Sequence, residues 1–145
     1  MDISILEEVI PTAYVSLTKS EEKLMRFLWE QGVPLSASEI QAQWKDNGWT
    51  KTYTRDIIRV LEEKGVIEFD SLERTGKKYG RRFRTVMTKE EFYSQEAIRN
   101  GITAGKLFQV EALALVKKGD NKGMENLIQE LEDMIEEYRA RDDEE

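Results

Sequence analysis

The sequence predicts a mainly helical protein of the α+β class, with a two-stranded hairpin between a group of three short helices and a longer helical region. Two observations support this order. Helix-start signals, in which Ser or Thr is followed three residues later by Glu, recur at Thr18, Ser36 and Thr88. After Gly65 the spacing of apolar residues changes from the helical period to the alternation of a strand.

Three helices are expected before the hairpin, over residues 18–31, 36–45 and 50–64. Each begins at a Ser or Thr whose hydroxyl can cap it. Gly32 and Gly65 are placed to end the first and third helices, because glycine readily adopts the left-handed conformation found there. A brief turn separates the second and third helices, which is the pattern of a helix-turn-helix.

The hairpin is expected to follow the third helix, with strands at residues 66–72 and 83–86. The residues between the strands, 74–82, contain two glycines and no acid, and we interpret them as a flexible basic loop. Helices and a hairpin in this order are typical of a winged helix-turn-helix, in which the hairpin is the wing. We place this domain at residues 18–87.

The rest of the chain is expected to be helical over residues 88–100, 103–118 and 121–141. A winged helix of this size closes its own core, so these helices form an appendage to it. The predicted divisions are therefore an N-terminal arm (residues 1–17), the winged helix (18–87), a helical dimerisation domain (88–141) and a frayed acidic tail (142–145).

The composition argues against an enzyme and against a metal or cofactor site. The 145 residues include no Cys and no His, which removes the usual ligands of zinc, copper and iron, the thiol nucleophile and the commonest acid/base group. Adjacent carboxylates such as Glu62 and Glu63 point apart on a helix, and we interpret them as solvated faces. No segment resembles a secretory signal or approaches ~18 apolar residues, so we expect no membrane partner and a cytoplasmic location.

The net charge of −7 hides an uneven distribution. Residues 125–145 hold ten acidic residues and two arginines, whereas the predicted wing holds a run of cations with no acid. A basic patch is therefore separated from an acidic C-terminal helix. The cations of the patch are Arg74, Lys77, Lys78, Arg81, Arg82 and Arg84.

The first turn of the third helix has the residue types expected of a helix that reads DNA. Its hydroxyls and Lys51 can bind phosphates, and Arg55 can pair with a guanine edge. The alternative is a capped surface helix that begins with threonines. The predicted DNA contacts of this helix are Thr50, Lys51, Thr52, Tyr53, Thr54, Arg55 and Arg59.

The basic loop lies where a winged helix makes its second DNA contact, with backbone phosphates. Charge runs are also common in solvated turns, which is the alternative here. The position of this run after a helix-turn-helix favours double-stranded DNA as the partner. The predicted contacts of the wing are Arg74, Lys77, Lys78, Arg81 and Arg82.

Apolar residues recur every three or four positions along the last helix, and the helix before it is too apolar to be exposed. Packing of the two helices within one monomer is one explanation. We favour a two-fold homodimer, which would bring two recognition helices to half-sites about one turn of DNA apart. The predicted dimerisation residues are Leu107, Phe108, Leu115, Leu127, Ile128, Leu131, Met134, Ile135 and Tyr138.

The chain resembles the penicillinase-repressor family of winged-helix transcriptional regulators over roughly residues 17–140. The resemblance implies a winged-helix domain, a helical dimerisation domain and repression by blocking a promoter at a palindromic operator. The segments that carry it, at matching spacing, are Leu24-Met25-Arg26-Phe27-Leu28-Trp29, Ser38-Glu39-Ile40, Gly48-Trp49-Thr50 and Leu61-Glu62-Glu63-Lys64-Gly65-Val66-Ile67.

The chain also departs from this family. Tyr53-Thr54 and Asp56-Ile57-Ile58 stand in the recognition helix where members usually have Thr-Val and Thr-Leu-Leu, so a different operator is expected. Without cysteine, the chain lacks the C-terminal cluster of copper-sensing members. The region matched to the Asn-Phe bond cut in proteolytically released members reads Leu113-Ala114-Leu115-Val116.

The sequence thus predicts a sequence-specific DNA-binding transcriptional repressor that acts as a homodimer on a palindromic operator. Two alternatives stay open. One is a winged helix used as a protein-interaction module through its acidic tail and apolar helices. The other is a ligand-sensing winged-helix regulator of another family, with a pocket between its domains.

Overall fold

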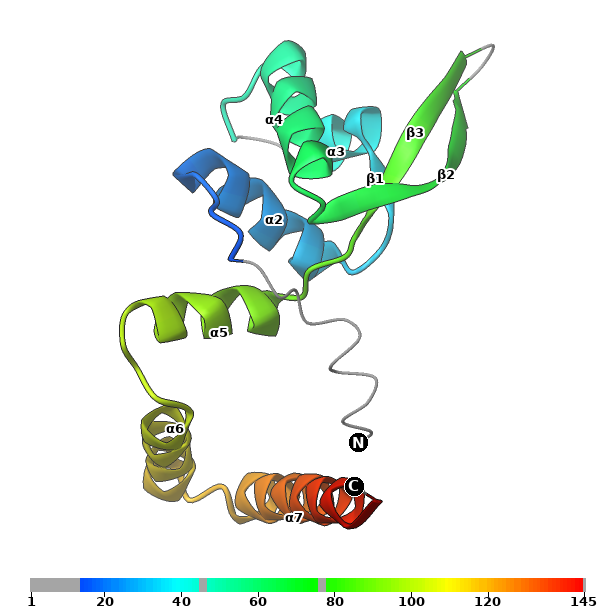
Figure 1. Cartoon of the computed structure of the whole chain (residues 1–145). Coiled ribbons are helices and arrows are strands. Elements are labelled where there is room, and N and C mark those ends of the chain that lie inside the picture. Colours follow the sequence, from blue (N-terminus) through cyan, green and yellow to red (C-terminus); the bar gives the residue numbers. More distant parts are fainter. Residues whose placement is uncertain (1–13, 45–46, 76–77, 145) are drawn as a thin grey trace. The chain divides into compact units, whose positions relative to one another are not determined.

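A computed structural model describes residues 14–44, 47–75 and 78–144 of the chain (Figure 1). The described residues belong to two compact units, divided between Phe92 and Tyr93. Most of the predicted N-terminal arm, residues 1–17, lies outside the described residues. Of its described part, Val15 and Leu17 pack against the core of the first unit.

The first unit is a winged helix-turn-helix. Its elements are α2 (Lys19–Gln31), β1 (Leu35–Ser36), α3 (Ala37–Gln43), α4 (Lys51–Glu63), β2 (Ile67–Thr75) and β3 (Lys78–Thr85). The three strands form one antiparallel sheet in the order β1-β3-β2. The hairpin of β2 and β3, which we call the wing, projects from the helices (Figure 1). This architecture confirms the predicted fold class.

The helix-start signals act as the sequence predicts. Thr18 and Ser36 form complete capping boxes, in which the hydroxyl accepts from the amide of the third residue and the Glu side chain accepts in return. Thr50 accepts a hydrogen bond from the amide of Tyr53 at 3.1 Å. Gly32 ends α2 in the left-handed conformation, with φ of 67°.

The core of the first unit lies where the helices meet the sheet. The apolar stripe of α2 supplies Leu24, Met25 and Leu28, and Ile58 and Leu61 come from α4. Phe92, beyond the predicted end of this domain at residue 87, is 2% exposed and belongs to the same core. The remaining buried apolar residues are Phe27, Leu35, Ile40, Val66, Ile67, Phe83 and Met87.

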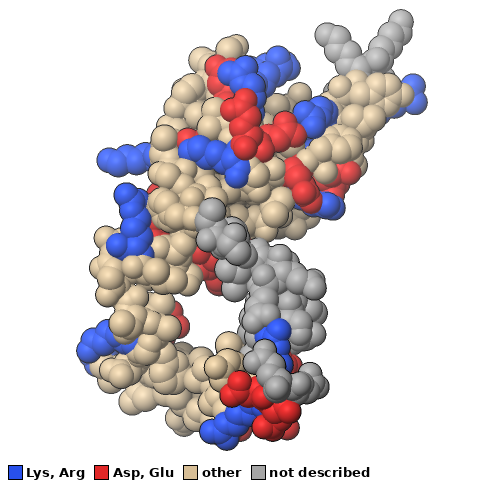
Figure 2. Space-filling view, in the orientation of Figure 1, with Lys and Arg blue, Asp and Glu red and all other residues tan. Residues whose placement is uncertain are grey.

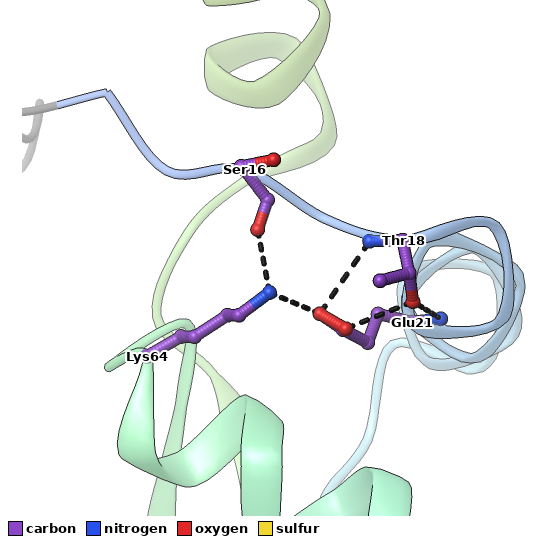
Figure 3. Close-up of polar contacts among 4 residues, drawn as sticks. All are labelled: Ser16, Thr18, Glu21 and Lys64. Carbon is purple, nitrogen blue, oxygen red and sulfur yellow. Dashed lines mark hydrogen bonds and ion pairs between the residues drawn. The ribbon is translucent and has the colours of Figure 1, made fainter.

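An ion pair joins the start of α2 to the end of α4 (Figure 3). The Glu21 side chain is almost fully buried and accepts from Lys64 and from the Thr18 hydroxyl. Lys64 also donates to the carbonyl of Ser16 at 2.6 Å. Burial raises the pKa of Glu21, but the hydrogen bonds from Lys64 and Thr18 outweigh it, so the pKa lies below its ordinary value.

The wing corrects the expected strands. Residues 74–82, interpreted as a loop, lie largely in β2 and β3, where Arg74 pairs with Tyr79 and Leu72 with Arg81. The register of β2 and β3 shifts between Phe69 and Ser71. Beyond this shift the side chains of β2 that face one side of the sheet change from odd to even positions, so the outer part of the strand does not continue the alternating pattern of its inner part. The short strand β1 is too brief to carry a periodic signal.

The second unit contains the rest of α5 (Lys89–Arg99), which begins in the first unit, together with α6 (Ala104–Lys118) and α7 (Asn121–Glu144). Thr103 caps α6 and Gly119 ends it in the left-handed conformation. Helix α7 continues to Glu144, three residues past the expected end of the helical region at Arg141. Neither Gly nor Pro follows Arg141, and extending a formed helix costs little. Among the described residues, no helix combines the length and apolarity needed to cross a membrane.

Candidate nucleic-acid interface

The first turn of α4 presents polar and basic side chains to solvent. Lys51, Thr52 and Arg55 are exposed, and the Thr50 hydroxyl caps the helix. No acidic residue lies in this turn, so the partial positive charge of the helix N-terminus is not offset there. The turn is therefore suited to an anion such as a phosphate.

Thr54 does not belong to this exposed surface. Its side chain is fully buried, and its hydroxyl lies 3.0 Å from Gln41 Oε1 and 3.0 Å from the Thr50 carbonyl oxygen. The Gln41 amide in turn donates to the Trp49 carbonyl at 3.0 Å. Thr54 thus joins α3 to the start of α4, and it lies beneath the exposed surface that holds the other predicted DNA contacts of this helix.

Tyr53 is the outer end of a column of aromatic rings. Its ring meets Trp49 edge-on at 4.9 Å, and Trp49 meets Trp44 in the same way at 4.9 Å. Trp44 stacks on Phe27 of α2 at 4.9 Å. The Tyr53 hydroxyl donates to Ser20 at 2.7 Å. Tyr53 is 39% exposed, but its ring is fixed by Trp49 and its hydroxyl by Ser20.

Arg55 and Arg59 lie along one side of a cleft of about 380 Å³ between α4 and β3. Arg59 is exposed and lies 3.3 Å from Asp56, three residues earlier on the same helix. Arg81 and Ser38 line the same cleft. Helix α4 and the wing therefore meet around a cleft lined by three arginines and Glu62.

Carboxylates of the protein hold three arginines of the wing. Arg81 pairs with Glu62 at 2.9 Å, and Arg84 pairs with Glu68 and lies 3.6 Å from Asp70. Arg82 donates to both oxygens of Glu39 at 2.9 and 3.2 Å. In Figure 2 the Lys and Arg side chains on the visible face of this unit are accordingly interleaved with Asp and Glu. The positive run in the sequence overstates the charge that the wing offers to a partner.

The ion pair between Arg82 and Glu39 also links β3 to α3. The hydrogen bond from Arg82 lowers the pKa of Glu39 below its ordinary value, despite partial burial, and raises the pKa of Arg82. Glu39 accepts from the Ser36 amide as part of the capping box. Arg82 therefore fastens β3 to the start of α3.

The outer wing holds the remaining predicted contacts. Arg74 is exposed on β2 opposite Tyr79, which is 63% exposed on β3. Lys77 lies outside the described residues, as does the side chain of Lys78. The partners of the inner arginines, Glu39 and Glu62, were not predicted as site residues. They are 43 and 19 residues from Arg82 and Arg81 in sequence, and no local pattern reveals such pairs.

The predicted dimerisation residues form a partly exposed apolar surface on α6 and α7. None of the α6 residues is buried. A cavity of about 310 Å³ within the second unit is lined by Leu107, Phe108, Leu127, Leu131 and Met134. The residues that are more than a third exposed are Leu107, Phe108, Ile128, Ile135 and Tyr138, and those that are half-buried are Leu115, Leu127, Leu131 and Met134.

Comparison with protein families identifies the chain. The model of the penicillinase repressor family matches residues 17–137, which covers the winged helix and most of the second unit. The chain belongs to the penicillinase repressor family. Comparison with curated proteins gives no match.

Membership of the penicillinase repressor family confirms the resemblance seen in the sequence. Its members are DNA-binding regulators that repress transcription. In this chain the helix-turn-helix is formed by α3 and α4, and α4 occupies the position of the recognition helix.

Proposed function

We propose that this protein binds double-stranded DNA as a homodimer at a palindromic operator and represses transcription by occupying a promoter. The observation that carries the proposal is the exposed, acid-free first turn of α4, which leads into the cleft that α4 shares with β3 of the wing. Such a turn enters the major groove in helix-turn-helix proteins, with the wing over the neighbouring backbone.

The proposed contacts are of two kinds, those to base edges and those to backbone phosphates. Arg55, one turn into α4, is placed to pair with a guanine edge, and Thr52 is placed to bond a base or a phosphate. Lys51 and the helix N-terminus are suited to phosphates. From the wing we assign phosphate contacts to Arg74, Lys77 and Lys78. Arg82 is left out because Glu39 holds it.

The second unit supplies the dimer. Its apolar residues Ile128, Ile135 and Tyr138 are 47%, 48% and 65% exposed on α7. Apolar side chains exposed in this number on two helices favour burial against another surface. A second copy of the same unit fits best, because a two-fold axis presents two recognition helices to a palindromic site.

Fluorescence anisotropy tests the proposal with a labelled duplex from the DNA upstream of the gene for this chain. We expect tighter binding to this duplex than to one of random sequence, and an affinity that falls steeply with salt. Sedimentation of the free protein should give the mass of two chains. Equal binding to both duplexes, or binding that is insensitive to salt, would contradict the proposal.

A further inference from the structure

We propose that Arg81 and Glu62 are a positioning pair, in which Arg81 holds the wing against α4 and does not bind a DNA phosphate. The inference rests on the proposed DNA-binding function, and it reassigns a residue that the sequence places among the phosphate contacts. The pair would set the angle between α4 and the wing, which decides whether α4 can lie in the major groove while the wing contacts the DNA backbone.

Arg81 is fixed in direction by a two-pronged contact. Its Nη2 donates to Glu62 Oε2 at 2.9 Å, and its Nη1 donates to Oε1 at 3.4 Å. Glu62 lies in the last turn of α4, and Arg81 lies on β3. Two parallel hydrogen bonds fix the plane of the guanidinium as well as its position, which a point charge would not do.

Two aromatic rings hold the same guanidinium. Its central carbon lies 5.2 Å from the ring centre of Phe69 and 5.0 Å from that of Phe83. Phe83 is a core residue, 7% exposed, and Phe69 pairs with it on β2. Arg81 is therefore attached to α4 by its charge and to both strands of the wing by its faces.

The pair lies where the direction of the wing is set. The register of β2 and β3 shifts between Phe69 and Ser71, and Leu72 pairs with Arg81 just beyond this shift. An irregularity of this kind bends and twists a strand pair. A contact from Arg81 to the recognition helix at this point fixes the angle at which the outer wing, with Arg74 and Tyr79, leaves the unit.

A phosphate contact by Arg81 conflicts with these surroundings. A phosphate that approached the guanidinium would meet the carboxylate of Glu62. If Arg81 left Glu62 for the DNA, it would leave an unpaired acid beside the nucleic acid. The two roles therefore predict opposite effects of removing the acid. Glu62→Gln weakens DNA binding if Glu62 positions Arg81, and strengthens it if Glu62 competes with a phosphate.

The experiment measures binding of the labelled upstream duplex over a series of salt concentrations for Glu62→Gln, Arg81→Gln and Arg81→Lys. We expect each to weaken binding about fivefold, with the slope of log K against log salt unchanged. Lys keeps the charge but lacks the fork and the planar face, so it should not rescue a positioning role. Glu63→Gln is the matched control, since Glu63 is exposed on the same helix.

Amide hydrogen exchange of the free protein provides a readout that needs no DNA. Exchange in β2 and β3 outward of Ser71 should be faster in Glu62→Gln and Arg81→Gln than in Glu63→Gln, while far-UV circular dichroism shows each variant folded. The double variant should bind DNA no more weakly than either single variant.

Several results would overturn the proposed positioning role of Arg81 and Glu62. Tighter binding by Glu62→Gln, rescue by Arg81→Lys, or a slope reduced by about 0.9 in Arg81→Gln would identify Arg81 as a phosphate contact. Unchanged hydrogen exchange in both variants would exclude a positioning role. If the wild-type chain binds no duplex, the proposed function fails by itself, and hydrogen exchange still decides whether the pair holds the wing.

Discussion

Replacement of Lys64 by Ala should destabilise the first unit by roughly 2–3 kcal/mol at neutral pH. Loss of one partner from a buried ion pair costs about 3–5 kcal/mol, because the other charge is left without compensation. Two features place this pair below that range. The Lys64 side chain keeps 31% exposure, and the buried carboxylate of Glu21 retains the hydroxyl of Thr18 at 2.8 Å.

The destabilisation should depend on pH. The pKa of Glu21 in the folded protein lies below its ordinary value, which is about 4.3 for a Glu side chain in the unfolded chain. Such a carboxylate contributes stability above the unfolded pKa and loses it as the pH falls through the folded pKa. The difference between wild type and Lys64→Ala should therefore be full at neutral pH and narrow in acid.

Urea unfolding, followed by tryptophan fluorescence at fixed protein concentration, measures this difference. The matched control is Lys19→Ala, because Lys19 is exposed at the start of α2. In Glu21→Gln the further loss of Lys64 should cost less than it does in wild type. The reasoning is refuted if Lys64→Ala costs no more than Lys19→Ala at neutral pH, or costs the same at pH ~3.

Three further predictions address the interface and the dimer. Thr54→Val should destabilise the first unit by about 1–2 kcal/mol in urea unfolding, because Gln41 loses a partner, and should leave the DNA affinity of the folded protein unchanged. Weaker DNA binding by the folded variant would return Thr54 to the DNA surface. Lys51→Gln should weaken binding to all duplexes alike and reduce the salt slope by about 0.9, as anisotropy will show, whereas an unchanged slope argues against a phosphate contact. Leu131→Asp should give monomers in sedimentation, with Glu132→Gln, exposed on the same helix, as control; a dimeric Leu131→Asp protein would place the interface elsewhere.

The helices could be predicted because their signals are local. A capping box links residues three positions apart, so Thr18 and Ser36 define the starts of α2 and α3 without knowledge of the rest of the fold. Thr54 shows how far this reasoning extends. It stands four and seven residues before Ile58 and Leu61, on the buried stripe of α4, so the helical period could have excluded it from the DNA surface.

The pairing of the wing arginines could not be predicted in this way. Whether Arg81 faces α4 depends on the strand register, and the register depends on the shift at Phe69. The contact between Arg82 and Glu39 further requires β1, a strand of two residues, to pair with β3. A count of charges along the sequence includes these arginines but not the carboxylates that the fold brings to them.

The aromatic column has a practical consequence for the study of this protein. All three tryptophans of the chain, Trp29, Trp44 and Trp49, lie in the first unit, and the ring of Trp49 touches Tyr53 at the start of α4. Tryptophan fluorescence therefore follows the winged helix alone, while far-UV circular dichroism follows the helices of both units. The natural chain thus allows the unfolding of its two units to be observed separately without an added label.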